Sequence, residues 1–103
     1  MSDAMPQQVQ IKADEKELLG QYSNLAVIHH NPEEFVVNFV YVFPSVAPGA
    51  PQGKLVSSVI LNPSHAKRLW RALGENISRY ESQFGPIRET PAPAMPTALG
   101  PLQ

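Results

Sequence analysis

Residues 35–43 read FVVNFVYVF, and Asn38 is the only one of the nine without a hydrophobic side chain. β-Branched and aromatic side chains favour the pleated, packed surface of a β-sheet. Because side chains alternate along a strand, the odd-numbered residues point to one face and the even-numbered residues to the other, and both sets are mostly apolar. The stretch therefore predicts a strand that needs cover on both faces.

Further strands are expected on either side of this one. Residues 22–30 (YSNLAVIHH) precede it, and the NPEE turn at 31–34 predicts an antiparallel hairpin, because proline presets the backbone of a type I turn. Residues 54–61 (KLVSSVIL) follow after a loop rich in proline and glycine. Residues 8–12 (QVQIK) alternate polar and apolar side chains and are a candidate fourth strand. The acidic stretch 13–21 predicts a loop or a single helical turn.

A long amphipathic helix is predicted over residues 63–84. Asn62 is a favoured N-cap, Pro63 suits the first helical position, and Gly85 followed by proline is a stop signal. Its apolar residues recur at alternating intervals of four and three, which is typical of a helix stripe and also of a short heptad seam. These residues are Ala66, Trp70, Leu73, Ile77, Tyr80 and Phe84. The expected fold is an α+β domain, with an antiparallel sheet of three to four strands and one long C-terminal helix packed on it.

Composition limits the class of protein. The chain has 103 residues, a net charge of −1 and no cysteine, which excludes disulfides and thiol chemistry and favours a reducing compartment. No stretch approaches the roughly 20 apolar residues of a membrane span, and the N-terminal residues lack the pattern of a signal peptide. We expect a cytoplasmic protein with a flexible N-terminus over 1–7, a single domain over 8–87 and a disordered proline-rich tail over 88–103.

The polar residues do not form a recognisable catalytic or cofactor motif. His29 and His30, with the glutamates at 33–34, resemble a set of metal ligands, but adjacent strand residues point to opposite faces and would not converge. Ser64 and His65 lie at the start of the helix without the third group and oxyanion site that nucleophilic catalysis needs. We therefore predict a protein that is not an enzyme and holds no metal or cofactor. An enzyme assembled across an oligomer interface from the histidines is a further alternative.

Self-association is expected, because one helix can cover only one face of a doubly apolar sheet and a domain of about 75 residues is marginal alone. The candidate interface is the second sheet face or the helix seam. On the central strand it comprises Val36, Asn38, Val40 and Val42, or the opposite set of residues. Asn38 would then form a hydrogen bond across the interface. The main hypothesis is a homo-oligomer, most simply a dimer, that acts as an interaction or scaffold protein for an unidentified protein partner.

The alternative function is the binding of single-stranded nucleic acid. Lys67, Arg68 and Arg71 would supply a basic patch on the helix, and the phenylalanine and tyrosine rings of the sheet would stack on bases. The competing interpretation is that the rings belong to the core and the charges form the wet face of the helix.

Several short motifs also carry a resemblance to a known family. They are Tyr22-x-Asn24, PEEF at 32–35, Asn38-Phe39, PSHAKRL at 63–69 and ISRYE at 77–81. On these motifs the sequence resembles, over about residues 10–87, a family of small bacterial proteins known only as domain of unknown function 3467. It departs from the family at Asn38, where members often carry aspartate, so an essential carboxylate at this position is not implied. The resemblance implies a small bacterial cytoplasmic protein and supplies no activity, cofactor or site residue.

Overall fold

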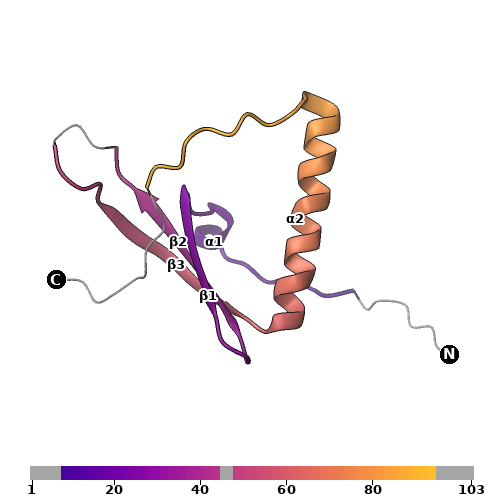
Figure 1. Cartoon of the computed structure of the whole chain (residues 1–103). Coiled ribbons are helices and arrows are strands. Elements are labelled where there is room, and N and C mark those ends of the chain that lie inside the picture. Colours follow the sequence, from indigo (N-terminus) through magenta and orange to yellow (C-terminus); the bar gives the residue numbers. More distant parts are fainter. Residues whose placement is uncertain (1–7, 45–47, 95–103) are drawn as a thin grey trace.

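The computed structural model of the chain describes residues 8–44 and 48–94. Its elements, in chain order, are α1 (Glu15–Leu18), β1 (Leu25–His30), β2 (Phe35–Val42), β3 (Gly53–Leu61) and α2 (Pro63–Phe84). The three strands form one antiparallel sheet with β2 in the centre, and α2 follows the last strand (Figure 1). The α+β class and the order of strands and helix that the sequence predicts are confirmed.

Before β1, the described residues 8–24 form one short helix and no strand. The single helical turn predicted between 13 and 21 is α1, which is held by a capping box between Asp14 and Glu17. The predicted fourth strand at residues 8–12 is not formed. Val9 and Ile11 are both exposed. Because these side chains pack against no neighbouring strand or core, the alternation of apolar and polar residues is not enough to form a strand.

The predicted antiparallel hairpin of β1 and β2 is formed, and its connection lies at residues 31–34. The Asn31 side chain accepts hydrogen bonds from the backbone N–H groups of Glu33 and Glu34, at 2.8 and 3.0 Å. β1 begins at Leu25 rather than at the predicted Tyr22. The reason is Asn24, whose side chain accepts from the backbone N–H of Val42 at 2.8 Å and donates to its carbonyl at 3.1 Å. A side chain therefore replaces the backbone pairing that would have extended the strand.

The pairing of β2 with β3 shifts register between Phe39 and Val40. Beyond the shift, β3 begins at Gly53, which comes close to the backbone of β2. A Cβ atom on Gly53 would lie 2.9 Å from the Tyr41 carbonyl oxygen and 3.1 Å from a methyl group of Val40. Only glycine fits this approach without a shift of the neighbouring strand, which explains why the pairing extends one residue further than the sequence predicts.

Local signals set both ends of α2. The Asn62 side chain accepts from the backbone N–H of His65 at 2.7 Å, and Pro63 occupies the first turn. Gly85 ends the helix with φ of 93°, a value that favours glycine, and its N–H donates to the Glu81 carbonyl at 2.9 Å. The predicted helix over residues 63–84 is confirmed.

The position of α2 differs from the prediction. Within one chain, α2 does not cover the sheet: no side chain of the helix is buried, and its contact with the sheet is made chiefly through β3. Figure 1 shows α2 rising from the end of β3 and diverging from the sheet. Asn62 is the one residue between β3 and α2, whereas connections that return a helix onto its sheet usually take about 2–6 residues. A connection this short directs the helix away from its own strand.

The core of a single chain is consequently small. Among the described residues, the buried hydrophobic side chains are Val27, Val40, Val42 and Leu61, and all four lie on the strands. After α2, residues 85–94 form neither helix nor strand and cross back toward the far end of the sheet (Figure 1). Residues 1–7, predicted to be flexible, and residues 95–103 of the predicted disordered tail lie outside the described residues. The predicted boundaries of the domain stay a prediction.

Candidate functional site

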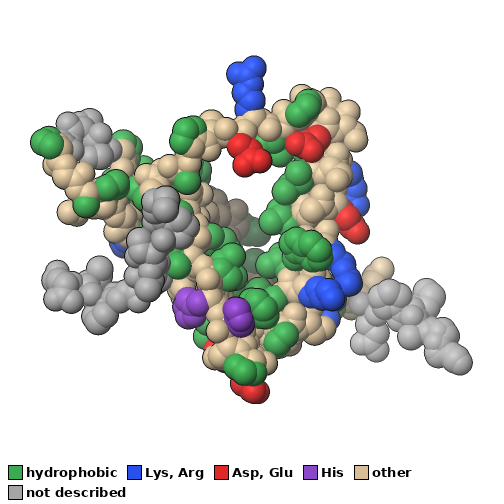
Figure 2. Space-filling model, in the orientation of Figure 1, with side chains coloured by type: hydrophobic (Ala, Val, Ile, Leu, Met, Phe, Trp, Pro, Cys, Tyr) green, Lys and Arg blue, Asp and Glu red, His purple; other side chains and the backbone are tan. Residues whose placement is uncertain are grey.

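One side of α2 is apolar and exposed to solvent along the length of the helix. We call it the α2 stripe, formed by Leu69, Trp70, Leu73, Ile77, Tyr80 and Phe84. Their exposed fractions run from 40% for Ile77 to 71% for Phe84, and Trp70 is 69% exposed. Figure 2 shows hydrophobic side chains along the side of α2 turned toward the sheet and an opening between the two. Contiguous exposed apolar surface of this kind marks an interaction site in a folded protein.

The sheet offers two apolar faces with different character. The Phe39 face carries the odd-numbered residues of β2, with Ile28 of β1 and Val59 of β3 beside Val37. These β2 residues are half-buried, and Ile28 is 60% exposed. The Asn38 face carries the even-numbered residues of β2. Its predicted interface residues are placed as follows: Asn38, Val40 and Val42 are buried, and Val36 is half-buried. Whether this face meets a partner stays a prediction.

Asn38 is 4% exposed and is the centre of a polar row across its face. The Ser58 hydroxyl donates to the Asn38 Oδ1 atom at 2.7 Å. The Asn38 Nδ2 atom lies 3.4 Å from the Val27 carbonyl oxygen and 3.4 Å from Nε2 of His29, both long contacts. The carboxamide is thus engaged within its own sheet, and no hydrogen bond across an interface is needed to satisfy it.

The histidines are not brought together. His29 contacts Asn38, whereas the ring of His30 stacks on Phe35 with centroids 5.2 Å apart, so the two imidazoles serve opposite faces as the sequence predicts. Within residues 8–44 and 48–94 there is no group of three His, Cys, Asp or Glu side chains that could hold a metal ion. At the start of α2 the Ser64 hydroxyl accepts from Arg68 at 2.7 Å and shows no pairing with His65.

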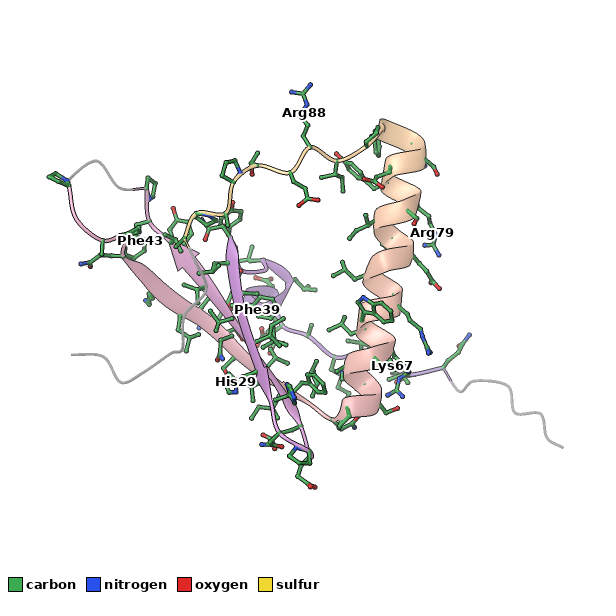
Figure 3. All side chains as sticks on the ribbon, in the orientation of Figure 1. His29, Phe39, Phe43, Lys67, Arg79 and Arg88 are labelled. Carbon is green, nitrogen blue, oxygen red and sulfur yellow. The ribbon has the colours of Figure 1, made fainter. Side chains whose placement is uncertain are left out.

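The basic residues of α2 lie on a different side of the helix from the stripe. Lys67, Arg68 and Arg71 are exposed, and at 100° per residue they fall more than a quarter turn from the centre of the α2 stripe. Figure 3 shows Arg79 on the outer side of α2, away from the sheet, and Figure 2 shows basic side chains along that side. The basic patch and the sheet aromatics therefore do not form one continuous surface in a single chain.

A cluster of aromatic rings lies at the end of the sheet farthest from the hairpin turn. The Tyr22 and Tyr41 rings pack edge to face with centroids 5.7 Å apart, and Tyr41 and Phe43 pack likewise at 5.4 Å. They border a hollow of about 430 Å³ whose wall also includes Pro93. Sequence reasoning missed this cluster because Tyr22 was assigned to a strand. The available signal was antiparallel pairing, which brings the residue before β1 to the end of β2.

The sequence model of one family, described as "Protein of unknown function (DUF3467)", matches residues 1–89. The chain belongs to this family. The DUF3467 match contains all three strands and α2, and it confirms the resemblance carried by the short motifs. Neither the curated proteins nor the solved structures include a match to the chain.

The DUF3467 chain has no helix, in the part that the structure describes, with the length and apolar character needed to cross a membrane. Several of its described polar side chains are engaged locally, in caps, turns and the contacts around Asn38. The arrangement therefore offers two kinds of surface for function: apolar faces without a partner, and the aromatic hollow at the end of the sheet.

Proposed function

We propose that this DUF3467 protein is a non-enzymatic interaction protein of the bacterial cytoplasm that works as a homodimer, in which the α2 stripe of each copy packs on the sheet of the other. The observation that carries the proposal is the exposure of the whole stripe beside a sheet that its own helix does not cover. Full burial of one large apolar side chain stabilises a protein by about 1.5–3 kcal/mol relative to exposure. Six such side chains per copy give a strong drive toward a partner.

A second copy is the partner favoured by the connection between β3 and α2. The single residue Asn62 holds the helix away from its own sheet, but it places no restriction on contact with the sheet of another copy. If each copy places its α2 on the sheet of the other, the stripes and the sheets of both copies are covered, and the assembly closes with twofold symmetry. A net charge of −1 per chain gives little repulsion between the copies.

The Phe39 face is the surface that suits the stripe better. Phe35, Val37 and Phe39 line it on β2, with Ile28 and Val59 on either side. On the Asn38 face, the buried carboxamide of Asn38 lies at the centre of the sheet between Val27 and Ser58, and it contacts the Ser58 hydroxyl and the His29 ring. An apolar helix gains more by covering a continuous apolar surface, because each polar group it desolvates costs free energy unless it stays hydrogen-bonded. We therefore favour the odd-numbered set over Val36, Asn38, Val40 and Val42.

The test is the oligomeric state of helix variants. At micromolar concentration, light scattering should give about twice the 11.3 kDa chain mass for the wild type. Leu73→Glu and Ile77→Glu should each give the monomer mass, because a charge on the stripe cannot be buried cheaply. Arg79→Glu, on the outer side of α2, is the matched control and should stay dimeric. A monomeric wild type at this concentration would overturn the proposal.

Trp70 gives an independent reading of the same assembly, because it is the only tryptophan in the chain and lies on the stripe. Its fluorescence emission should shift to the red on dilution as the helix loses its partner. Isotope-filtered NOE spectra of a mixture of labelled and unlabelled chains should show contacts from Trp70 to the sheet of the other copy. If those contacts arise only within one chain, the exchange of helices is wrong.

Single-stranded nucleic-acid binding is the alternative. It predicts a salt-dependent rise in the fluorescence anisotropy of a labelled oligonucleotide, lost when Lys67, Arg68 and Arg71 are all changed to glutamate. We expect no rise at low salt, because the basic patch and the sheet aromatics face apart. A rise that the triple variant abolishes would favour the alternative over the scaffold function.

A further inference from the structure

We propose that the aromatic cluster at the end of the sheet is a binding site for a proline-rich segment, and that residues 91–94 of the chain occupy it. The site goes beyond the dimer proposal, since none of its residues lies on the α2 stripe. Pro93 lines the hollow together with Tyr22, Tyr41 and Phe43. A proline against a row of aromatic rings is the contact by which aromatic grooves recognise proline-rich segments.

Tyr41 lies on β2, whereas Tyr22 lies just before β1 and Phe43 just after β2. Tyr41 lies between the other two rings, with interplanar angles of 74° to Tyr22 and 64° to Phe43. The segment that carries Tyr22 is fastened to the end of β2 by the two hydrogen bonds between Asn24 and Val42. Phe43 is fixed by its backbone N–H, which donates to the Gln52 carbonyl at 2.8 Å. The three rings are thus placed by β2 and by the segments fastened to its end, and Pro93 completes the wall of the hollow.

The path of the chain after α2 brings the tail to this site. Gly85 turns the chain at the end of the helix, and the Ile87 N–H donates to a carboxylate oxygen of Glu81 at 2.9 Å. From there the segment crosses the opening to the far end of the sheet (Figure 1). The DUF3467 match ends at residue 89, so the aromatic site lies within the family domain and its occupant lies outside it.

The sequence of the tail suits the site. Residues 91–96 read PAPAMP, a composition that favours the extended polyproline II conformation and loses little entropy on binding. Proline has no backbone N–H group, so the carbonyl groups of such a segment are not used within it and can accept hydrogen bonds from other groups. In aromatic grooves, tyrosine hydroxyls donate these hydrogen bonds. A second hollow of about 530 Å³ shares Tyr22 and Tyr41 with the first, which leaves room for a longer proline-rich ligand on either side of the tyrosine pair.

The first measurement is an NMR spectrum of the full-length protein. Proline ring protons that lie against aromatic rings are shifted upfield, so Pro93 should show this shift together with NOEs to Tyr41. Tyr22→Ala should reduce the shift. Tyr22 is 72% exposed, so this change leaves the sheet folded. Arg79→Ala removes an exposed side chain on the outer side of α2 instead and should leave the Pro93 signals unchanged.

The second measurement is binding of a fluorescent peptide with the sequence of residues 89–96, ETPAPAMP. It should bind the full-length variant Pro91→Ser/Pro93→Ser about tenfold more tightly than the wild type, as expected for a site nine-tenths occupied by its own tail. Adding Tyr22→Ala should abolish that binding, and adding Arg79→Ala should not. No binding of the peptide to the double proline variant at millimolar concentration, or binding that is indifferent to Tyr22→Ala, would overturn the proposal. Either result would leave the light-scattering test of the dimer unaffected.

Discussion

At the scale of single residues, Asn24 shows how one side chain decides where the sheet ends. Its carboxamide pairs with both backbone groups of Val42, as a neighbouring strand residue would. β1 therefore begins only at Leu25, while Tyr22, which precedes it in the chain, is still held beside Tyr41. Asn24 therefore sets the residue at which β1 begins, and it also positions the first ring of the aromatic cluster.

The change Asn24→Ala should lower the free energy of unfolding by about 1–3 kcal/mol, because it leaves backbone groups of Val42 without partners in a half-buried place. Urea denaturation at a fixed protein concentration measures the loss. Asn76→Ala is the matched control, since the Asn76 side chain bonds only to the Ala72 carbonyl on the exposed surface of α2. It should change the free energy by less than about 0.5 kcal/mol. Equal effects of the two changes would contradict the role given to Asn24.

At the scale of elements, local signals were sufficient for α2 and for the three strands of the sheet, apart from the start of β1, but they also predicted a strand at residues 8–12 that is not formed, and they were insufficient for packing. The bounds of α2 follow from Asn62, Pro63 and Gly85, which act on neighbouring backbone groups and can be recognised in the sequence. The place of α2 beside the sheet could not be predicted in this way. The apolar stripe specifies that something must cover it, and the pattern is the same whether the cover comes from the same chain or another. The aromatic hollow was missed for a related reason, because Pro93 reaches it over a long distance in sequence.

The two faces of the sheet can be distinguished by a matched pair of substitutions. Ile28 lies on the Phe39 face with 60% exposure, and Ile60 lies on the Asn38 face with 63% exposure. Both are isoleucines on outer strands, so glutamate at either position should leave the sheet folded, as circular dichroism would show. Ile28→Glu should convert the dimer into a monomer in light scattering, while Ile60→Glu should not. The reverse result would transfer the interface to Val36, Asn38, Val40 and Val42.

At the scale of the whole molecule, one chain is too open for its length. The Cα radius of gyration is 17.5 Å, whereas a compact chain of about 100 residues has a radius of about 13 Å. Figure 2 shows an opening between the sheet, the helix and the segment 85–94. In the proposed dimer, assembly would supply much of the apolar burial, so the apparent stability should rise with protein concentration.

The length of the connection between β3 and α2 is the feature that makes assembly obligatory in our proposal. Inserting about four glycine and serine residues between Leu61 and Asn62 brings the connection into the range that returns a helix onto its own sheet. It also preserves Asn62 as the N-cap of α2. Closure within one chain then competes with exchange between copies, and it wins at low concentration because it costs no association entropy.

We therefore expect the insertion variant to be a monomer in light scattering, with the emission of Trp70 blue-shifted and independent of dilution. The same insertion after Ala50, in the exposed loop between β2 and β3, is the control and should leave the dimer intact. A monomer with red-shifted emission would mean that α2 does not close onto its own sheet, and the sheet would then not be the surface that the stripe covers. A dimer that persists in the first variant would show that the short connection does not determine the exchange.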